Sequence, residues 1–284
     1  MQPSEITLIS RAAKPSDYRL VARLCRRAVG RGDYVLLVLR DVIAEGGLFL
    51  AWSDGELVGM VNFEECIDGS GWLGMGRTDP DWRRRGVALF LQQRIEAQAR
   101  RKGIRYLRLW VLSRNRPSRL ASLKGGFRPV CEATHVTNHI RVKREVRRTS
   151  PLRSASSEFL QSLLQTDCLS KMNGYFAYKW HFVKASAELM EKLVLKGEVY
   201  QDGKTSFILT KPEIAFGDRY SYFTPLQGSA ASNLQRIKNL ARGYGPIKVG
   251  SYLPYDGHLL SIARENGFRR DSWGNHCVVF EKRI

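Results

Sequence analysis

The chain has 284 residues, with a hydrophobic fraction of 43% and a charged fraction of 26%, proportions that exclude wholesale disorder. It contains no run of about 18 apolar residues, and its N-terminus lacks the basic and apolar regions of a secretory signal, so we expect neither a membrane span nor a signal peptide. The formal net charge is +19, which fits anionic ligands or partners and fits a basic soluble surface equally well.

The cysteine and histidine residues predict no disulfide framework and no metal site. The five cysteines are far apart, no Cys-x-x-Cys motif occurs, and the five histidines show no ligand spacing. We therefore expect a cytoplasmic protein with reduced thiols and no bound metal. The cysteines are Cys25, Cys66, Cys131, Cys168 and Cys277.

The first half of the chain alternates helical and strand patterns. Apolar periodicity predicts the helices, and apolar runs bounded by Gly, Asp and Ser predict the strands. The predicted elements are helices over 15–29 and 33–47, two strands within 48–65, a strand over 71–79, a helix from Gly86 to Gly103, a strand over 105–112, a helix over 117–127 and a strand over 136–146.

The second half repeats this order, after a basic and serine-rich segment over 147–158 that predicts a linker or a helix entry. Residues 106–128 and 247–269 share a strand, a polar turn, a short helix and Gly-Phe-Arg, at a shift of 141 residues. Two copies of one α/β unit would produce this pattern, and chance similarity of two β-α segments is the alternative. The predicted domains are residues 1–148 and 149–284.

The stretch "PDWRRRGVALF" (80–90) carries the chemistry. A strand is predicted to end near Asp79 and a helix to start near Gly86. The first amides of a helix have no intrahelical partner and lie at the positive end of the dipole, so they bind phosphate where the backbone is accessible. Gly86 and Ala88 give that access, and Arg83, Arg84 and Arg85 add cations.

This stretch resembles the acyl-CoA loop of the GCN5-related N-acetyltransferases (GNATs), Gln/Arg-x-x-Gly-x-Gly/Ala. The match here is Arg83-Arg84-Arg85-Gly86-Val87-Ala88, and the resemblance covers about residues 6–146. It implies an α/β fold of tandem GNAT-like domains, with a central twisted mixed sheet flanked by helices, and acetyl-CoA as co-substrate. The residues implied to bind acetyl-CoA are Arg77, Thr78, Arg83, Arg84, Arg85, Gly86, Val87, Ala88, Asn115 and Ser118.

The resemblance departs from the family at residue 122. Many GNATs place there the tyrosine that protonates the leaving thiolate of CoA, and this chain has Ser122. Water or another tyrosine, such as Tyr34, could then serve, and a catalytically inactive protein is also compatible. Asn115, Ser118 and Gly126-Phe127 occupy the positions of the family's Asn-x-x-Ala…Gly-Phe pattern.

Acyl transfer requires a neutral amine, which a carboxylate can produce by removing a proton. Glu64, Glu65 and Asp68 lie near a predicted strand end, and strand alternation places Glu64 and Glu65 on opposite faces. Either of these two could face the active site, and solvated carboxylates are the alternative. Asp33 and Tyr34 precede the second helix, where the resemblance implies acceptor contacts; Asp33 could equally cap that helix.

The second half resembles a degenerate GNAT unit, because "PLQGSAAS" (225–232) replaces the phosphate loop without an arginine. The two-lobed layout is loosely similar to the histidine N-acetyltransferase group, which implies a small amino acid or similar amine. We expect an N-acetyltransferase that uses acetyl-CoA to acetylate a primary amine of a small molecule or peptide by direct attack in a ternary complex. The alternative is an inactive GNAT-fold module that binds CoA or nucleic acid, with the basic run at 141–148 as a possible nucleic-acid contact.

Overall fold

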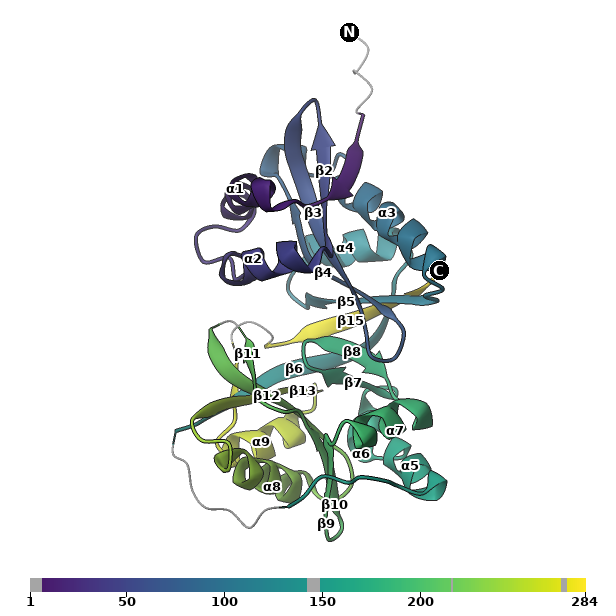
Figure 1. Ribbon diagram of the computed structural model, residues 1–284, viewed down its shortest axis with the longest axis vertical. Coiled ribbons are helices and arrows are strands. Elements are labelled where there is room, and N and C mark those ends of the chain that lie inside the picture. The colour runs from purple at the N-terminus through teal and green to yellow at the C-terminus, as the bar shows by residue number, and fades with distance from the viewer. Residues whose placement is uncertain (1–6, 142–148, 216, 272–274) are drawn as a thin grey trace. The chain divides into compact units, whose positions relative to one another are not determined.

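The computed structural model describes residues 7–141, 149–215, 217–271 and 275–284, and its chain divides into two compact units (Figure 1). Unit 1 comprises Met1–Leu109, Arg116–Arg128 and Glu281–Ile284, and unit 2 comprises Trp110–Asn115 and Pro129–Phe280. The boundary between the units falls within three strands, β5 (Tyr106–Leu112), β6 (Arg128–Ile140) and β15 (Cys277–Arg283). The boundary predicted at residue 148, and residues 142–148 of the basic run, lie outside the described residues.

The sheet of unit 1 is mixed. β1 to β4 pair in sequence order and are antiparallel, whereas β4 and β5 are parallel, which requires the intervening helix as a crossover. The strands are β1 (Ile9–Ala12), β2 (Leu48–Ser53), β3 (Glu56–Glu65), β4 (Gly71–Thr78) and β5 (Tyr106–Leu112).

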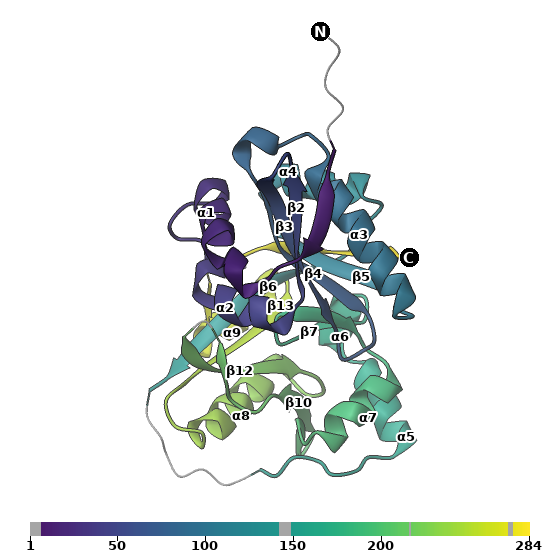
Figure 2. The same cartoon turned by 45° about the horizontal axis from the view of Figure 1, so that its top comes forward.

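Helices cover both faces of this sheet (Figures 1 and 2). The helices are α1 (Tyr18–Ala28), α2 (Val35–Glu45), α3 (Val87–Arg101) and α4 (Arg116–Lys124), with short 3₁₀ turns at Pro15–Asp17 and Pro80–Trp82. α1 and α2 pack in one core with Leu48, Leu50 and Met60, and α3 packs in another with Ala51 and Val58. The helices pack on the two faces of the sheet because each has an apolar stripe at helical spacing.

Unit 2 is also an α/β structure, and β6, β13, β12, β10 and β9 are neighbours in that order. Its helices are α5 (Ser157–Leu164), α6 (Asp167–Lys171), α7 (Ala187–Leu195), α8 (Ala230–Arg242) and α9 (Gly257–Glu265). Its strands are β6 (Arg128–Ile140), β7 (Tyr175–Tyr178), β8 (His181–Lys184), β9 (Val199–Asp202), β10 (Thr205–Leu209), β11 (Glu213–Ala215), β12 (Asp218–Pro225), β13 (Ile247–Pro254), β14 (Arg269–Arg270) and β15 (Cys277–Arg283), of which β7 and β8 form a separate hairpin. α8 and α9 pack on the core of β12 and β13.

The two segments that resemble one another in sequence also share local structure. β5 is followed by α4, and β13 is followed by α9. Each helix ends before a glycine of positive φ, Gly126 at 84° and Gly267 at 82°. The next residue, Phe127 or Phe268, is 1% exposed. A left-handed glycine therefore turns a buried phenylalanine back into the core in both segments.

The sequence patterns did not predict several of the observed elements. The strand predicted from residue 136 begins at Arg128, because Pro129 and scattered polar residues hide the apolar alternation. The hairpin β7–β8 and helices α6 and α7 were not predicted. β7 is buried at all four positions and so lacks the polar alternation that identifies a half-exposed strand.

Candidate functional site

The ladder between β4 and β5 is short. It consists of two pairs, Gly71–Leu107 and Trp72–Arg108, although β4 continues to Thr78. Within the described residues, the edge of β4 beyond Trp72 therefore has no strand partner on the β5 side. An unpaired strand edge presents amide and carbonyl groups that a ligand can use.

A bulge lies in the part of β4 that pairs with β3 but not with β5. Met60 is opposite Arg77 and Asn62 is opposite Gly74, so that Val61 faces two residues of β4. Met75 lies in the bulge and has a φ of 56°, which is rare for a residue with a side chain. Bulges redirect the strand and its side chains and often occur next to functional sites.

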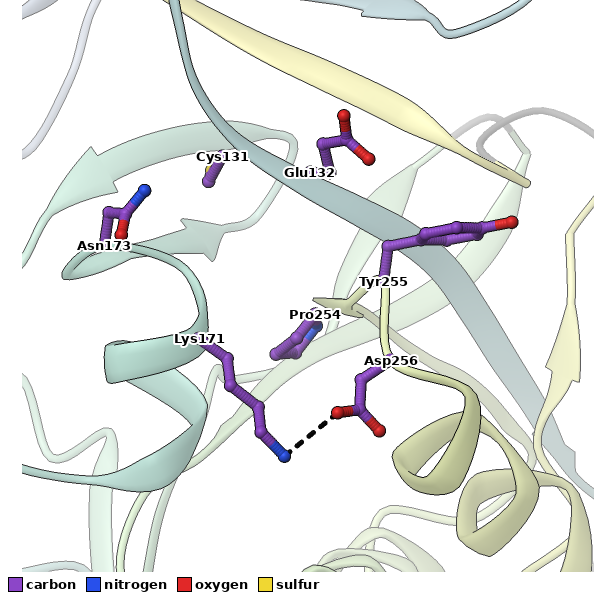
Figure 3. Close-up of a pocket in the computed structure, with 7 residues that line it drawn as sticks. All are labelled: Cys131, Glu132, Lys171, Asn173, Pro254, Tyr255 and Asp256. Atoms are coloured by element: carbon purple, nitrogen blue, oxygen red, sulfur yellow. Dashed lines mark ion pairs between the residues drawn. The ribbon is translucent and has the colours of Figure 1, made fainter.

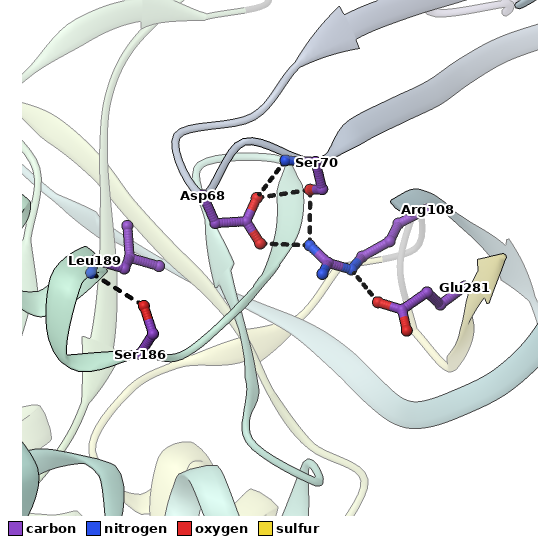
Figure 4. Close-up of polar contacts among 6 residues, drawn as sticks. All are labelled: Asp68, Ser70, Arg108, Ser186, Leu189 and Glu281. Carbon is purple, nitrogen blue, oxygen red and sulfur yellow. Dashed lines mark hydrogen bonds and ion pairs between the residues drawn. The ribbon is translucent and has the colours of Figure 1, made fainter. Parts of the chain in front are cut away.

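A buried ionic network holds the paired end of β4 and β5 (Figure 4). The Arg108 guanidinium donates to Asp68 at 2.5 Å, to Ser70 Oγ at 2.7 Å and to Glu281 at 2.7 Å. The side chain of Arg108 is 4% exposed. Asp68, which the sequence places near a strand end, is thus an ion-pair partner of Arg108. The network holds together the ends of β4 and β5 that pair with one another.

The loop after β4 contains two residues with positive φ, of which one is a glycine. A 3₁₀ turn over Pro80–Trp82 leads into Arg83, and α3 begins at Val87. Arg84 has a φ of 63° and Gly86 a φ of 82°. A Cβ added at Gly86 would meet no atom within 4 Å, so the backbone in front of the helix is accessible. This is the accessible helix N-terminus that the sequence predicted.

The first turn of α3 lies very close to the sheet. A Cβ added at Gly59 of β3 would lie 2.5 Å from Val87 Cγ1, and Val87 is 1% exposed. Only glycine at residue 59 allows this approach. The contact between Gly59 and Val87 therefore sets how closely the first turn of α3 packs against β3.

Ion pairs hold the loop against α1. Arg27 donates to Asp79 at 3.0 Å and to Asp81 at 2.7 Å, and Arg83 donates to the carbonyl oxygen of Ala28 at 3.0 Å. Arg85 stacks over the ring of Trp82 at 5.2 Å. Arg83, Arg84 and Arg85 are all exposed. The sequence did not identify Arg27, because its acidic partners lie 52 and 54 residues away.

Asp33 and Arg77 form a buried bidentate pair. Arg77 Nε and Nη2 donate to the two carboxylate oxygens of Asp33 at 2.8 and 2.7 Å. The Asp33 side chain is 0% exposed, and its Oδ1 also accepts from the amide of Val35 at 3.1 Å. Asp33 thus contacts the start of α2 and joins it to β4, while the predicted substrate contact of Asp33 stays a prediction.

Tyr34 lies beside this pair. The guanidinium of Arg77 is 5.4 Å from the centre of the Tyr34 ring. Burial raises the pKa of the Tyr34 phenol, the positive charge of Arg77 opposes that rise, and the negative charge of Asp33 adds to it. Because the net pKa is raised, the phenol remains protonated at neutral pH.

Glu64 and Glu65 lie on opposite faces of β3, as strand alternation predicts. Glu64 is half-buried and accepts from Asn62 Nδ2 at 2.7 Å, whereas Glu65 is exposed and pairs with Lys102 after α3. Burial raises the pKa of Glu45 on α2, and the charges of Glu64 and Asp41 raise it further. Glu64 is therefore the glutamate on the α2 side, in a negatively charged environment.

The α4 residues have local contacts. Asn115 precedes α4, and its amide donates to Leu112 O at 2.8 Å. Ser118 lies in the first turn, and Ser122 Oγ donates to the carbonyl oxygen of Ser118 at 3.0 Å. Ser122 is 7% exposed. The hydroxyl at the departure from the family pattern is thus bonded within its own helix.

A pocket in unit 2 contains none of the predicted site residues (Figure 3). Its volume is about 320 Å³, and Lys171 pairs with Asp256 at 3.1 Å within it. Asp256 also accepts from the amide of Leu259 and so caps α9. The lining residues are Cys131, Glu132, Lys171, Asn173, Pro254, Tyr255 and Asp256.

The described residues contain no cluster of His, Cys, Asp or Glu that could hold a metal ion. All five cysteines are buried. None of the helices within the described ranges has the length and hydrophobicity needed to span a bilayer.

The segment that contains β4, the arginine loop and α3 matches a known protein family. Residues 19–124 match the model of the Acetyltransferase (GNAT) family. Residues 19–124 therefore form a domain of the GNAT family. GNAT acetyltransferases transfer acetyl groups from acetyl-CoA to acceptors, and the matched segment includes β4, the arginine loop and α3. No curated protein sequence matches the chain.

Solved GNAT structures resemble the chain over nearly its whole length. A protein from Thermoplasma acidophilum assigned as an acetyltransferase is 18% identical, with 97% of this chain and 100% of that chain covered and a TM-score of 0.59. A GCN5-related N-acetyltransferase from Sphaerobacter thermophilus is 14% identical, with 97% and 95% covered and a TM-score of 0.58. These likenesses establish the mixed α/β GNAT fold and leave the acceptor open.

Proposed function

We propose that this GNAT protein is an N-acetyltransferase that moves the acetyl group of acetyl-CoA to a primary amine of a small molecule or peptide. The observation that carries the proposal is the juxtaposition of the unpaired edge of β4 with the accessible N-terminus of α3. The first would align the thioester and pantetheine along Arg77 and Thr78. The second would bind the diphosphate through backbone amides from Gly86 to Ala88.

The arginine loop fits an anionic donor. Gly86 and Ala88 are exposed, and the exposed arginines at 83–85 can approach phosphate oxygens. Asn115 and Ser118, which come from the family pattern, would contact the donor farther along. The interaction of Arg83 with Ala28 O and the stacking of Arg85 on Trp82 restrict these side chains before a ligand binds.

The acceptor side of the proposal involves Glu64 and Tyr34. Glu64, with Glu45 nearby, would attract a cationic amine and accept its proton, whereas Glu65 already pairs with Lys102. The neutral amine would form the new N–C bond as the C–S bond breaks. Tyr34, protonated at neutral pH, would give its proton to the departing sulfur and regain one from solvent. Positioning in a ternary complex would supply most of the rate.

Unit 2 would act as a degenerate GNAT domain that does not bind CoA. β12 and β13 pair in parallel from Tyr220–Lys248 to Tyr222–Gly250, after which β7 approaches β12: Thr224 Oγ1 donates to Ala177 O at 3.2 Å. The ring of Trp180 lies 5.4 Å from that of Tyr222. The chain's own hairpin thus lies where a donor would need space, which supports a structural role for residues 149–284.

The acceptor proposed here is a free amino acid or a similar small amine, following the loose similarity to the histidine N-acetyltransferase group. A peptide N-terminus is the other member of the same substrate class. The protein is proposed to work in the cytoplasm, since its sequence has no Cys-x-x-Cys motif and its cysteines are far apart.

An inactive module that retains CoA binding is the second candidate, and Ser122 favours it. Its hydroxyl donates to Ser118 within α4 and so does not replace the missing tyrosine as a proton donor. The two candidates share the donor site and differ in turnover.

Calorimetry with acetyl-CoA and a thiol-release assay with a panel of amines test both candidates. We expect micromolar binding that Gly86→Trp abolishes, because the indole would fill the space in front of α3. Thiol release that depends on one class of amine supports the enzyme, and binding without turnover supports the module. Unchanged binding by Gly86→Trp would refute the donor site itself.

A further inference from the structure

Three arginines form a stripe on the exposed face of α1. Arg19, Arg23 and Arg26 are exposed, whereas Val21, Leu24 and Cys25 are buried in the core. At about 100° per residue, the three arginines lie within an arc of about 60° on the side opposite the core. We refer to Arg19, Arg23 and Arg26 as the α1 arginine stripe.

The N-terminal part of the stripe, Arg19 and Arg23, is electrostatically unfavourable for the helix alone. The sequence of α1 contains no Asp or Glu, and its first turn, which holds Arg19, lies at the positive end of the helix dipole. Arg19 and Arg23 are four residues apart, a spacing at which like charges repel. An arrangement that costs stability in the free protein is explained if an anion binds there.

Ion pairing within the protein does not relieve this charge. In the described part of the chain, Arg19, Arg23 and Arg26 take part in no ion pair, whereas Arg27, the next arginine of α1, pairs with Asp79 and Asp81. Asp79 and Asp81 are thus already paired with Arg27. The three positive charges of the stripe are therefore available to bind an anionic partner.

The arginine loop contacts the C-terminal end of α1. Arg27 joins the C-terminal turn of α1 to Asp79, just after β4, and Arg83 donates to the carbonyl oxygen of Ala28. The exposed arginines at 83–85 therefore lie beside the end of α1 that holds Arg26.

We propose that the α1 arginine stripe is a docking surface for the phosphate backbone of a nucleic acid strand. With a helical rise of about 1.5 Å per residue, the arginines are separated by about 4.5 to 6 Å along the helix. A nucleic acid strand carries a phosphate about every 3.4 Å along its axis, so its phosphates are spaced closely enough for one to lie within reach of each arginine. Guanidinium groups bind phosphate oxygens bidentately, and all three cations of the stripe are arginines.

Other anionic partners fit the stripe less well. Membrane-surface helices insert an apolar face into the lipid, and the apolar face of α1 is buried in the core of unit 1. The centre of a protein interface is apolar and rich in aromatic residues, and the stripe contains none of these. A sequence-independent strand contact requires only regularly spaced cations.

The experiment compares two charge-matched variants. The stripe variant is Arg19→Gln, Arg23→Gln and Arg26→Gln. The control variant is Arg94→Gln, Arg101→Gln and Arg105→Gln, which removes three exposed arginines on or after α3. Binding of a fluorescent oligouridine of about 20 nucleotides is measured by anisotropy over a range of salt concentrations, and thermal unfolding confirms that all proteins are folded.

We expect the stripe variant to bind at least about tenfold more weakly at about 0.1 M salt. Its slope of log K against log salt should be smaller by about 2, since each phosphate contact contributes about 0.7. The control should retain the slope within about one contact. The proposal is overturned if the native protein does not bind the oligonucleotide, or if both variants lose equal affinity. It is also overturned if phosphatidylserine vesicles or polyglutamate bind more tightly through the stripe.

Discussion

The guanidinium of Arg77 on β4 makes two hydrogen bonds, of 2.8 and 2.7 Å, to the fully buried carboxylate of Asp33. The two residues are 44 positions apart. The pair connects the entrance of α2 to the bulged part of β4. Tyr34 lies against the same guanidinium, so the pair also fixes the proposed proton donor.

Breaking this pair should destabilise the protein strongly. Asp33→Asn leaves the buried Arg77 charge without its counter-ion, and we expect the free energy of unfolding in urea to fall by about 3 kcal/mol. The double variant Asp33→Asn with Arg77→Met should lose less than the sum of the single variants, because it removes both charges.

The matched control for that experiment is the exposed pair of Lys192 and Glu188, four residues apart on α7. Glu188→Gln should change the free energy of unfolding by no more than about 0.5 kcal/mol. A similar loss in Asp33→Asn and in Glu188→Gln would show that burial of the Arg77 pair has no special energetic weight.

Substitution by alanine should introduce similar backbone strain at Gly86 and at Gly55, which lies outside the proposed donor site. Their φ angles are 82° and 78°, and a Cβ added at either would meet no atom within 4 Å. Each glycine-to-alanine change should cost about 1 kcal/mol of folding free energy. We expect only Gly86→Ala to weaken acetyl-CoA binding in calorimetry, because it alters the backbone in front of α3. Equal affinity of the two variants for acetyl-CoA would remove the loop from the donor site.

Tyr34→Phe should separate binding from turnover. We expect kcat to fall about 100-fold with an unchanged Kd for acetyl-CoA, as for loss of a general acid. Burial raises the pKa of Tyr34, so the phenol deprotonates only above its usual value of about 10, and the native enzyme should keep its alkaline activity up to that pH.

Tyr18→Phe is the control for Tyr34→Phe. Tyr18 is half-buried in α1 and lies under Arg40, outside the proposed machinery. Full turnover by Tyr34→Phe, with a pH profile like that of the native protein, would assign the proton to water instead.

His135 of unit 2 should make stability depend on pH. It is 1% exposed, its Nε2 lies 3.2 Å from Tyr220 OH, and its Nδ1 lies 3.6 Å from Asp271. Burial lowers the pKa of His135; Asp271 opposes this, whereas the charge of Lys248 adds to it. Because the folded pKa is lower, only the unfolded chain gains this proton as the pH first falls below about 6.5.

Thermal unfolding between about pH 5 and 8 tests this expectation. The native midpoint should be highest above about pH 6.5 and decline below it, and His135→Gln should reduce the decline. His258→Gln, on the exposed side of α9, is the control. An equal acid decline in the native protein and His135→Gln would contradict the assignment to His135.

The local parts of the site were predictable because they are contiguous in the sequence. The end of β4, the arginines at 83–85 and the start of α3 follow one another within a few residues, so strand, turn and helix signals locate the accessible amides directly. The same holds for the repeated Gly-Phe after α4 and after α9. The structure confirms the mixed α/β fold that these patterns and the family resemblance predicted.

Other parts of the site depend on register between distant strands, which sequence periodicity does not encode. A bulge opposite Val61 directs the end of β4, and the packing of α2 places Glu64 in a negatively charged environment while Glu65 pairs with Lys102. The sequence by itself determined the helix N-terminus with its cations, because hydrogen bonding there is local. Only the tertiary structure decided the partners of Asp33, Arg27 and Arg108, because burial selects ion pairs between segments that are far apart along the chain.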